Sequence, residues 1–321
     1  MLRRRLGGHS VCDDDFIMMI RTTACWAGCV LVAVLGRPSS LHAQTAPTPA
    51  PADQTTPAPA AQTSDPDSRL DPLQPDFNIA ALPTTLRVPM HKAAFRVTHR
   101  FTRALGSGDF GDLLSNFFGF DSGAQIGLEV RYGLMRGTQI GVHRTSDRTI
   151  EIFGQQSILQ QKADGHPIGL DLIATLEGTN NFRAQKSAAV TVPSQKSSAI
   201  GLLISRKVAK IAAVYAEPMI VFNTNSLPRG SGVDNNTTMI GLGTRLRIRP
   251  TTYLIGEITP RLSGYKPGAN QASFGIEARA GGHTFQINFS NGFGTTLGQI
   301  ARGGINNNSW FIGFNISRKF F

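Results

Sequence analysis

Residues 239–249 read MIGLGTRLRIR, and the pattern of this stretch decides the fold. Its even-numbered positions are mainly apolar, whereas the odd-numbered positions after Met239 hold only glycine and arginine. Successive side chains of a β-strand point to opposite faces, so this alternation predicts a strand with one apolar and one polar face. The same alternation recurs in residues 124–134, 168–177 and 274–280.

Twelve segments carry this pattern, and tight turns between them alternate with connections that are mostly long. The segments are residues 94–103, 123–134, 137–145, 149–161, 166–178, 197–206, 210–223, 237–249, 252–264, 271–280, 283–290 and 308–320. An even number of strands, with short turns at one end and long loops at the other, is typical of bacterial outer-membrane barrels. We therefore expect an all-β fold, a closed antiparallel transmembrane up-and-down β-barrel of twelve strands with short periplasmic turns and longer external loops.

The last segment favours a membrane barrel over two soluble alternatives. A β-sandwich and a lipocalin-like barrel also alternate, because each hides one apolar face. Neither explains the row of apolar residues on the final strand, which consists of Trp310, Ile312, Phe314, Ile316 and Phe320. This strand resembles the C-terminal signature with which the barrel-assembly machinery pairs in outer-membrane proteins. Arg318 within the row and the out-of-phase Phe321 are departures from that signature.

The composition excludes several other classes of protein. Only 17% of the 321 residues are charged, which excludes a coiled coil, and three cysteines are too few for a disulfide scaffold. No apolar run of about 18 residues follows residue 43, so a polytopic helical membrane protein is also excluded. The net charge is +11, but the sequence has no recognisable nucleic-acid motif, and we expect no nucleic-acid partner.

Residues 1–43 are predicted to be a cleaved signal peptide. Residues 24–35 (ACWAGCVLVAVL) form an apolar run of signal-peptide length after Arg21, and cleavage is expected after Ala43. Residues 1–17 show no signal feature, and we interpret them as an over-extended gene start. All three cysteines lie before the cleavage site, so the exported protein would have no thiol. We expect export through the inner membrane and localisation in the bacterial outer membrane.

Residues 44–76 are predicted to be a disordered periplasmic linker, and residues 77–321 the barrel domain. Residues 44–75 contain eight prolines, many alanines and threonines and no aromatic residue. Such a segment cannot bury enough apolar surface to offset the entropy of ordering it. The simplest interpretation is a linker without a binding role, and the alternative is a tether to peptidoglycan or another periplasmic partner.

The polar faces of the strands are expected to line the lumen, because the apolar faces must meet lipid. The expected lumen charges are Arg96, Arg100, Glu129, Arg131, Glu151, Asp171, Glu177, Glu217, Arg245, Arg247, Glu257, Arg261, Glu277 and Arg279, together with Arg249. One interpretation is a path for anions or a site for an acidic ligand. The other is a ladder of Arg–Glu pairs that fills a narrow barrel. Eight basic against seven acidic residues favour the paired ladder, because unpaired charges in a confined space are costly.

Three motifs add a family resemblance. The strand FRVTHRF (95–101) is followed by LSNFFGFD (114–121) and then by GVHRTS (141–146). This order resembles an uncharacterised family of bacterial outer-membrane β-barrels, a domain of unknown function in which an FFG-hydrophobic-D box follows the first strand. The resemblance implies the barrel and its location over about residues 90–321, but no activity and no catalytic residue.

The FFGFD box consists of Phe117, Phe118, Gly119, Phe120 and Asp121. Three phenylalanines in one loop favour burial, so we expect this loop to fold into the mouth of the barrel. Gly119 would allow a tight backbone bend, and Asp121 would cap a turn. The alternative interpretation is a hydrophobic gate for a ligand.

The sequence contains no GxSxG, HExxH or P-loop motif, so we expect neither an enzyme nor a cofactor or metal site. The expected function is a narrow channel or small-molecule transporter. The alternative is a structural or accessory barrel whose linker binds a periplasmic partner, and a membrane enzyme ranks third. The expected partners are outer-membrane lipid and lipopolysaccharide, and the barrel-assembly machinery during insertion.

Overall fold

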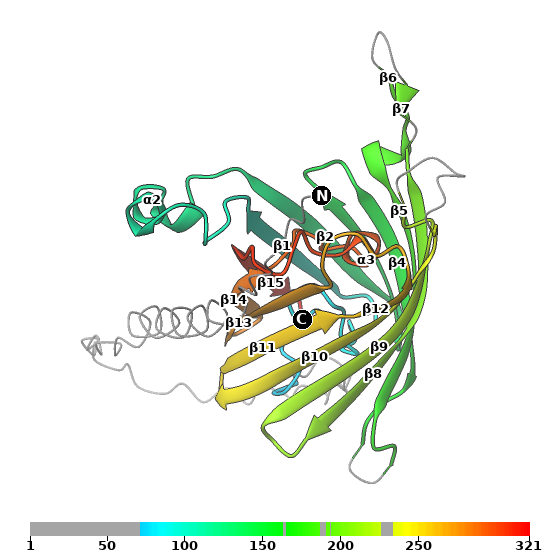
Figure 1. Ribbon diagram of the computed structural model, residues 1–321. Helices are drawn as coiled ribbons and strands as arrows, with labels where there is room; N and C mark the ends of the chain where they lie inside the picture. The colour runs from blue at the N-terminus through cyan, green and yellow to red at the C-terminus, as the bar shows by residue number, and fades with distance from the viewer. Residues whose placement is uncertain (1–70, 163–164, 187–190, 193, 226–233) are drawn as a thin grey trace, which may run out of the picture. The chain divides into compact units, whose positions relative to one another are not determined.

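The computed structural model describes residues 71–321 except 163–164, 187–190, 193 and 226–233. In this part the chain forms one closed antiparallel sheet, which Figure 1 shows as a barrel. Its strands are β1 (Ala93–Phe101), β2 (Ala124–Met135), β3 (Thr138–Thr145), β4 (Ile150–Leu159), β5 (Gly169–Gly178), β8 (Lys196–Val208), β9 (Ala212–Phe222), β10 (Thr237–Arg249), β11 (Thr252–Thr259), β12 (Arg261–Gly264), β13 (Gln271–Ala280), β14 (His283–Ser290) and β15 (Phe311–Lys319).

The strands β11 and β12 are two parts of one barrel strand, because both pair with β10 and only Pro260 separates them. Proline has no N–H to donate to a neighbouring strand, so it interrupts the hydrogen bonding without ending the barrel strand. The barrel closes where β1 pairs with β15, for example at Val97 opposite Ile316. With β11 and β12 counted as one strand, the predicted closed antiparallel barrel of twelve strands is therefore confirmed.

The connections show the predicted asymmetry between the two ends of the barrel. Two-residue turns join β2 to β3, β10 to β11 and β13 to β14, and we call their side the tight-turn end. The opposite, long-loop end carries α2 (Phe110–Ser115), η2 (Phe117–Gly119), η3 (Thr179–Phe182), the hairpin of β6 (Gln185–Lys186) and β7 (Thr191–Val192), and α3 (Leu297–Arg302). Among the described residues, no helix is long and apolar enough to cross a membrane.

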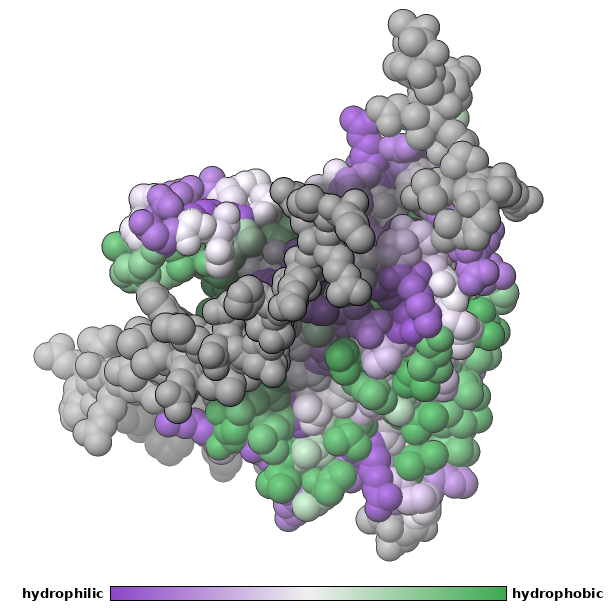
Figure 2. Space-filling model, viewed as in Figure 1, coloured by the Kyte–Doolittle hydropathy of each residue, from purple (hydrophilic) through white to green (hydrophobic). Residues whose placement is uncertain are grey.

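The outer surface of the barrel is apolar, as the alternation predicts. In β2, Leu128 and Val130 are 45% and 52% exposed, whereas Glu129 and Arg131 are each only 3% exposed. Figure 2 shows the hydrophobic surface in green over much of the strand surface that is visible below the long-loop end. An outward apolar band with an inward polar face is the arrangement that a strand needs in lipid.

Two further segments of the chain occupy the interior. Residues 71–88, drawn in cyan in Figure 1, enter from the tight-turn end, and the loop that contains α3 enters from the long-loop end. Ile79 of the first segment and Ile300 of α3 belong to one buried apolar cluster with Leu203 and Met239 of the wall. The polar strand faces were predicted to line the lumen, but its wall along β8 to β10 is partly apolar and packs against these segments.

Candidate functional site

The first candidate site is a hairpin of the N-terminal segment that lies inside the barrel. The N–H of Ile79 donates to the carbonyl of Leu82 at 2.8 Å, and the N–H of Thr84 donates to the carbonyl of Phe77 at 2.7 Å. These bonds flank an antiparallel bridge between Asn78 and Pro83 and define a hairpin whose tip has Ile79 and Leu82 at its corners. Both corner residues are at most 1% exposed. We call residues 76–84 the plug hairpin.

One carboxylate of the wall binds the tip of the plug hairpin. Glu257 Oε2 accepts the N–H groups of Ala80 at 2.9 Å, Ala81 at 3.1 Å and Leu82 at 3.1 Å, and Glu257 Oε1 accepts the N–H of Ala81 at 2.9 Å. A turn leaves these N–H groups without backbone partners, and a buried donor without an acceptor is costly. Glu257 therefore supplies what the turn lacks, through charge-assisted bonds.

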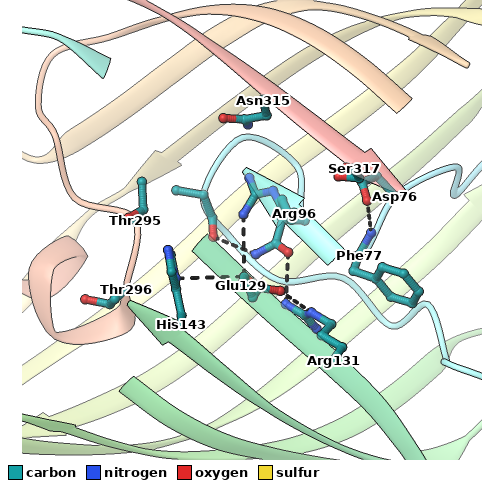
Figure 3. Close-up of polar contacts among 12 residues, drawn as sticks. Asp76, Phe77, Arg96, Glu129, Arg131, His143, Thr295, Thr296, Asn315 and Ser317 are labelled. Carbon is teal, nitrogen blue, oxygen red and sulfur yellow. Dashed lines mark hydrogen bonds and ion pairs between the residues drawn. The ribbon is translucent and has the colours of Figure 1, made fainter. Parts of the chain in front are cut away.

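Wall side chains also bind the carbonyl groups of the plug hairpin. The carbonyl of Ala80 accepts from Arg96, from Arg100 at 3.4 Å and from Asn315 at 3.0 Å. At the preceding residue, Gln286 Nε2 donates to the carbonyl of Ile79 at 2.6 Å. Figure 3 shows Arg96, Glu129 and Arg131 in one cluster beside this segment. The wall thus binds the hairpin mainly through its backbone.

Asn78 and Asp76 add contacts on the stem of the hairpin. Arg245 Nη2 donates to the carbonyl of Asn78 at 2.8 Å, and Arg131 Nη2 donates to its side-chain oxygen at 2.9 Å. The hydroxyl of Ser317 donates to Asp76 Oδ2 at 2.6 Å (Figure 3). Residues 71–76 lie on the linker side of the predicted domain boundary at residue 77, and the structure places them in the barrel.

Part of the predicted charge ladder is present as ion pairs across the wall. Glu129 pairs with Arg131 and lies 3.7 Å from Arg96, and Arg245 Nε lies 2.8 Å from Glu277 Oε1. His143 Nδ1 lies 3.8 Å from Glu129 Oε2, as Figure 3 shows. These carboxylates therefore have a basic partner, which lowers the cost of burying them.

Two other wall carboxylates bind the α3 loop instead of a wall arginine. Glu151 Oε1 accepts the N–H of Leu297 at 2.9 Å. Glu177 accepts the hydroxyl of Thr296 and pairs with Arg302 at 2.5 Å. Thr296 also forms a capping box with Gln299 at the start of α3. The acidic side of the lumen therefore holds the loop that closes the long-loop end.

The remaining predicted lumen charges have varied surroundings. Arg261 donates to four backbone carbonyls near the long-loop end, and Asp171 accepts from Gln155 at 2.7 Å. Within the described chain, neither carboxylate oxygen of Glu217 has a hydrogen-bond partner, although this side chain is fully buried.

Twelve of the fifteen predicted lumen charges are buried, and three are not. Arg247 and Arg279 are only partly buried, and Arg247 donates to the carbonyl of Pro250 in a tight turn at 3.1 Å. Arg249, at the end of the same strand, is exposed. The alternation of side chains predicted the inward face for these residues. Near the end of a strand, however, a long side chain such as that of Arg247 reaches the turn instead of the lumen.

A cavity of about 340 Å³ lies at the tight-turn end, between the N-terminal segment and the wall. Its polar lining includes Gln74, Thr85, Gln161 and Ser205. A second cavity, of only about 20 Å³, lies between the plug hairpin and the α3 loop. The second cavity has room for about one water molecule, so the plug hairpin and the α3 loop leave little open space between them there.

The FFGFD box lies outside the barrel, so the prediction that it folds into the mouth is wrong. Phe117 is 61% exposed and Phe120 is 41% exposed. The ring of Phe120 packs edge-on against Phe101 at 4.7 Å. Phe101 shares its strand face with His99, whose ring stacks on Phe314 at 4.7 Å. Asp121 is exposed, and the capping carboxylate of this loop is Asp109, at the start of helix α2.

The described part of the chain contains no group of three His, Cys, Asp or Glu side chains that could hold a metal ion. The plug hairpin is the part of the candidate site that the sequence interpretation missed. A short apolar run, IAAL at residues 79–82 between prolines, is the one signal of its burial.

The family described as "Membrane bound beta barrel domain (DUF5777)" matches residues 76–320. The chain belongs to this family. The match extends from the plug hairpin to the last strand and confirms the expected membership of an uncharacterised family of membrane barrels. That the FFGFD box is a mark of the family remains a prediction.

Several solved structures are similar in fold, at low identity. The NanC porin is 10% identical over 72% of this chain and 99% of its own, with a TM-score of 0.44. Outer membrane phospholipase A from Escherichia coli is 12% identical over 75% and 95%, with a TM-score of 0.41. An outer membrane channel from Pseudomonas putida F1 is 11% identical over 73% and 97%, with a TM-score of 0.41. No curated protein matches the sequence.

Proposed function

We propose that this protein is a narrow outer-membrane channel for small polar solutes, which its own plug hairpin closes from the tight-turn side. One observation carries the proposal: the charged wall residues hold the hairpin through its backbone. Glu257 binds three N–H groups of the turn, and Arg96 and Arg245 bind carbonyls. Water or a polar solute can replace each of these bonds, so the hairpin can leave without stranding a buried charge.

The size of the barrel fits a small solute. A barrel of twelve strands lies between eight-stranded barrels filled by side chains and open porins of sixteen or more strands. With the hairpin withdrawn, its wall would present both signs of charge, from Arg96 and Arg245 to Glu129 and Glu277. Such a mixture favours polar solutes over ions of one sign. The cavity of about 340 Å³ would then be the entrance at the tight-turn end.

A second function, an accessory barrel with a permanent plug, is favoured by a different observation. Ile79 and Leu82 lie in a buried apolar cluster with wall residues, and exposing them to water would oppose opening. In that case the barrel would serve as a membrane anchor for the preceding segment. Neither proposal includes a catalytic step.

A reversible cross-link distinguishes the two functions. The hydroxyls of Thr85 and Ser205 lie 2.5 Å apart, so cysteines at these positions would have their sulfur atoms within bonding reach. We would combine Thr85→Cys and Ser205→Cys with serine at Cys12, Cys25 and Cys29, and record currents in planar bilayers. A channel closed by the hairpin should open in reducing buffer and stay closed after oxidation.

The single variant Thr85→Cys is the matched control and should not respond to oxidant. Equal conductance in the oxidised and reduced states would show that ions pass without hairpin movement, and would refute the gate. Silence in both states, also after Glu257→Ala, would favour the accessory barrel.

A further inference from the structure

The loop between β1 and β2 has two different faces. Asp109 caps α2 through a capping box with Asp112, and Ser115 follows three residues later, so polar groups share one side of the helix. Leu114 lies on another side and is 53% exposed, and Phe117 is 61% exposed. Leaving two such side chains in water is unfavourable, because each keeps more than half of its surface exposed.

The apolar side of this loop is continuous with the outer wall of the barrel. Phe120 connects the two, because its ring contacts Phe117 at 5.4 Å and Phe101 at 4.7 Å. Phe101 belongs to the outward face of β1, beside Phe314 of β15 at 6.2 Å. In Figure 2 the region of α2 is hydrophilic on its upper side and hydrophobic on its lower side, which is turned toward the level of the strands.

A cluster of three aromatic rings, which we call the aromatic girdle, lies on the outer wall at the same end of the barrel. Phe274 stacks on Phe289 at 5.3 Å and contacts Trp310 at 5.2 Å. Phe274 and Phe289 lie on β13 and β14, and Trp310 directly precedes β15, which pairs with β1 in the sheet. Aromatic side chains gather where the hydrocarbon of a bilayer meets its headgroups. The girdle therefore places Phe101, and the loop that rests on it, near this boundary.

We propose that the β1–β2 loop lies in the membrane interface, with Leu114, Phe117 and Phe120 inserted among lipid acyl chains and the polar side of α2 toward the headgroups. Lipid is the occupant because the loop extends the lipid-facing wall through a direct ring contact. An amphipathic helix of this kind lies in the plane of the interface. The loop is an anchor outside the barrel, so this inference does not depend on the channel or on its plug.

Site-specific fluorescence quenching tests the inference on the full chain. The three native cysteines are replaced by serine, and NBD is attached to Phe117→Cys or, as the matched control, to Ser115→Cys on the polar side. Each protein is reconstituted in phosphatidylcholine vesicles that contain lipid nitroxides at shallow or deep positions. Aqueous iodide is the second quencher. A gel-shift on boiling confirms that each labelled barrel is folded.

The label at residue 117 should be protected from iodide and quenched best by the shallow nitroxide, at a depth of about 5–10 Å below the headgroup boundary. The label at residue 115 should be quenched mainly by iodide. Equal iodide quenching at both positions would overturn the proposal. Protection of residue 117 from iodide and from both nitroxides would also overturn it, and disulfide-linked dimers of unlabelled Phe117→Cys would then identify a second copy as the occupant.

Discussion

Glu257 is the residue whose substitution should most directly open the channel. Its carboxylate accepts three consecutive N–H groups, from Ala80 to Leu82, at 2.9 to 3.1 Å. In Glu257→Gln, one oxygen still accepts, but the charge is lost and an amide NH₂ faces these donors. Hydrogen bonds to a charged group contribute about 1.5–3 kcal/mol each, against about 1 kcal/mol for neutral ones.

The substitution should weaken the bound hairpin by about 2 kcal/mol, because up to three bonds lose their charge assistance. That difference corresponds to a roughly 30-fold higher ratio of open to closed channel. Single-channel recording measures this ratio as open probability. The control is Glu217→Gln, which removes another buried wall carboxylate, whose two oxygens lack hydrogen-bond partners in the described chain.

An unchanged open probability in Glu257→Gln would refute the assignment of Glu257 as the anchor of the hairpin. An equal rise in Glu217→Gln would refute it as well, because the effect would then follow from the loss of any buried charge. A change in unitary conductance without a change in open probability would mean that the carboxylate lines an already open path.

Three further predictions follow from the same contacts. Gly243→Ala should raise open probability, because its Cβ would lie 2.1 Å from the Ile79 side chain, whereas Gly256→Ala on the neighbouring strand meets nothing closer than 3.9 Å and should be neutral in the same recordings. Limited proteolysis followed by mass spectrometry should leave a core that begins near residue 71, and a core that begins after residue 88 would contradict a bound hairpin. On SDS gels, boiled and unboiled protein should migrate differently, since a closed barrel resists the detergent, and identical migration would contradict the folded membrane barrel.

The barrel could be predicted from sequence because lipid imposes one rule on every strand. Each outward position must be apolar, so the period of two appears wherever a strand crosses, as in residues 239–249. The turn lengths then fix the order of neighbouring strands. Pro260 in the middle of a barrel strand did not hide the period of two, because the alternation of side chains continues on both sides of it.

The contents of the lumen could not be predicted in the same way. The wall charges are visible in the sequence, but many of their partners are backbone groups, which every residue has. Nothing about Ala80 or Ala81 shows that their N–H groups meet Glu257. The predicted pairing of wall arginines with wall glutamates is therefore present for only some of them, as in Arg245 and Glu277.

The wrong placement of the FFGFD box and the missed plug have one physical origin. Three phenylalanines were expected inside the mouth because water was taken as the solvent outside, yet at the rim of a membrane barrel the outside is hydrocarbon. Conversely, residues before Phe77 were interpreted as too polar to fold, yet the lumen offers hydrogen-bonding groups that fit a polar backbone. In the proposed arrangement Phe117, which is 61% exposed, would face hydrocarbon at the rim, whereas Asp76, which is 2% exposed, lies among the polar groups of the lumen. The quenching experiment tests the outer side of the barrel wall, and the gating experiments test its inner side.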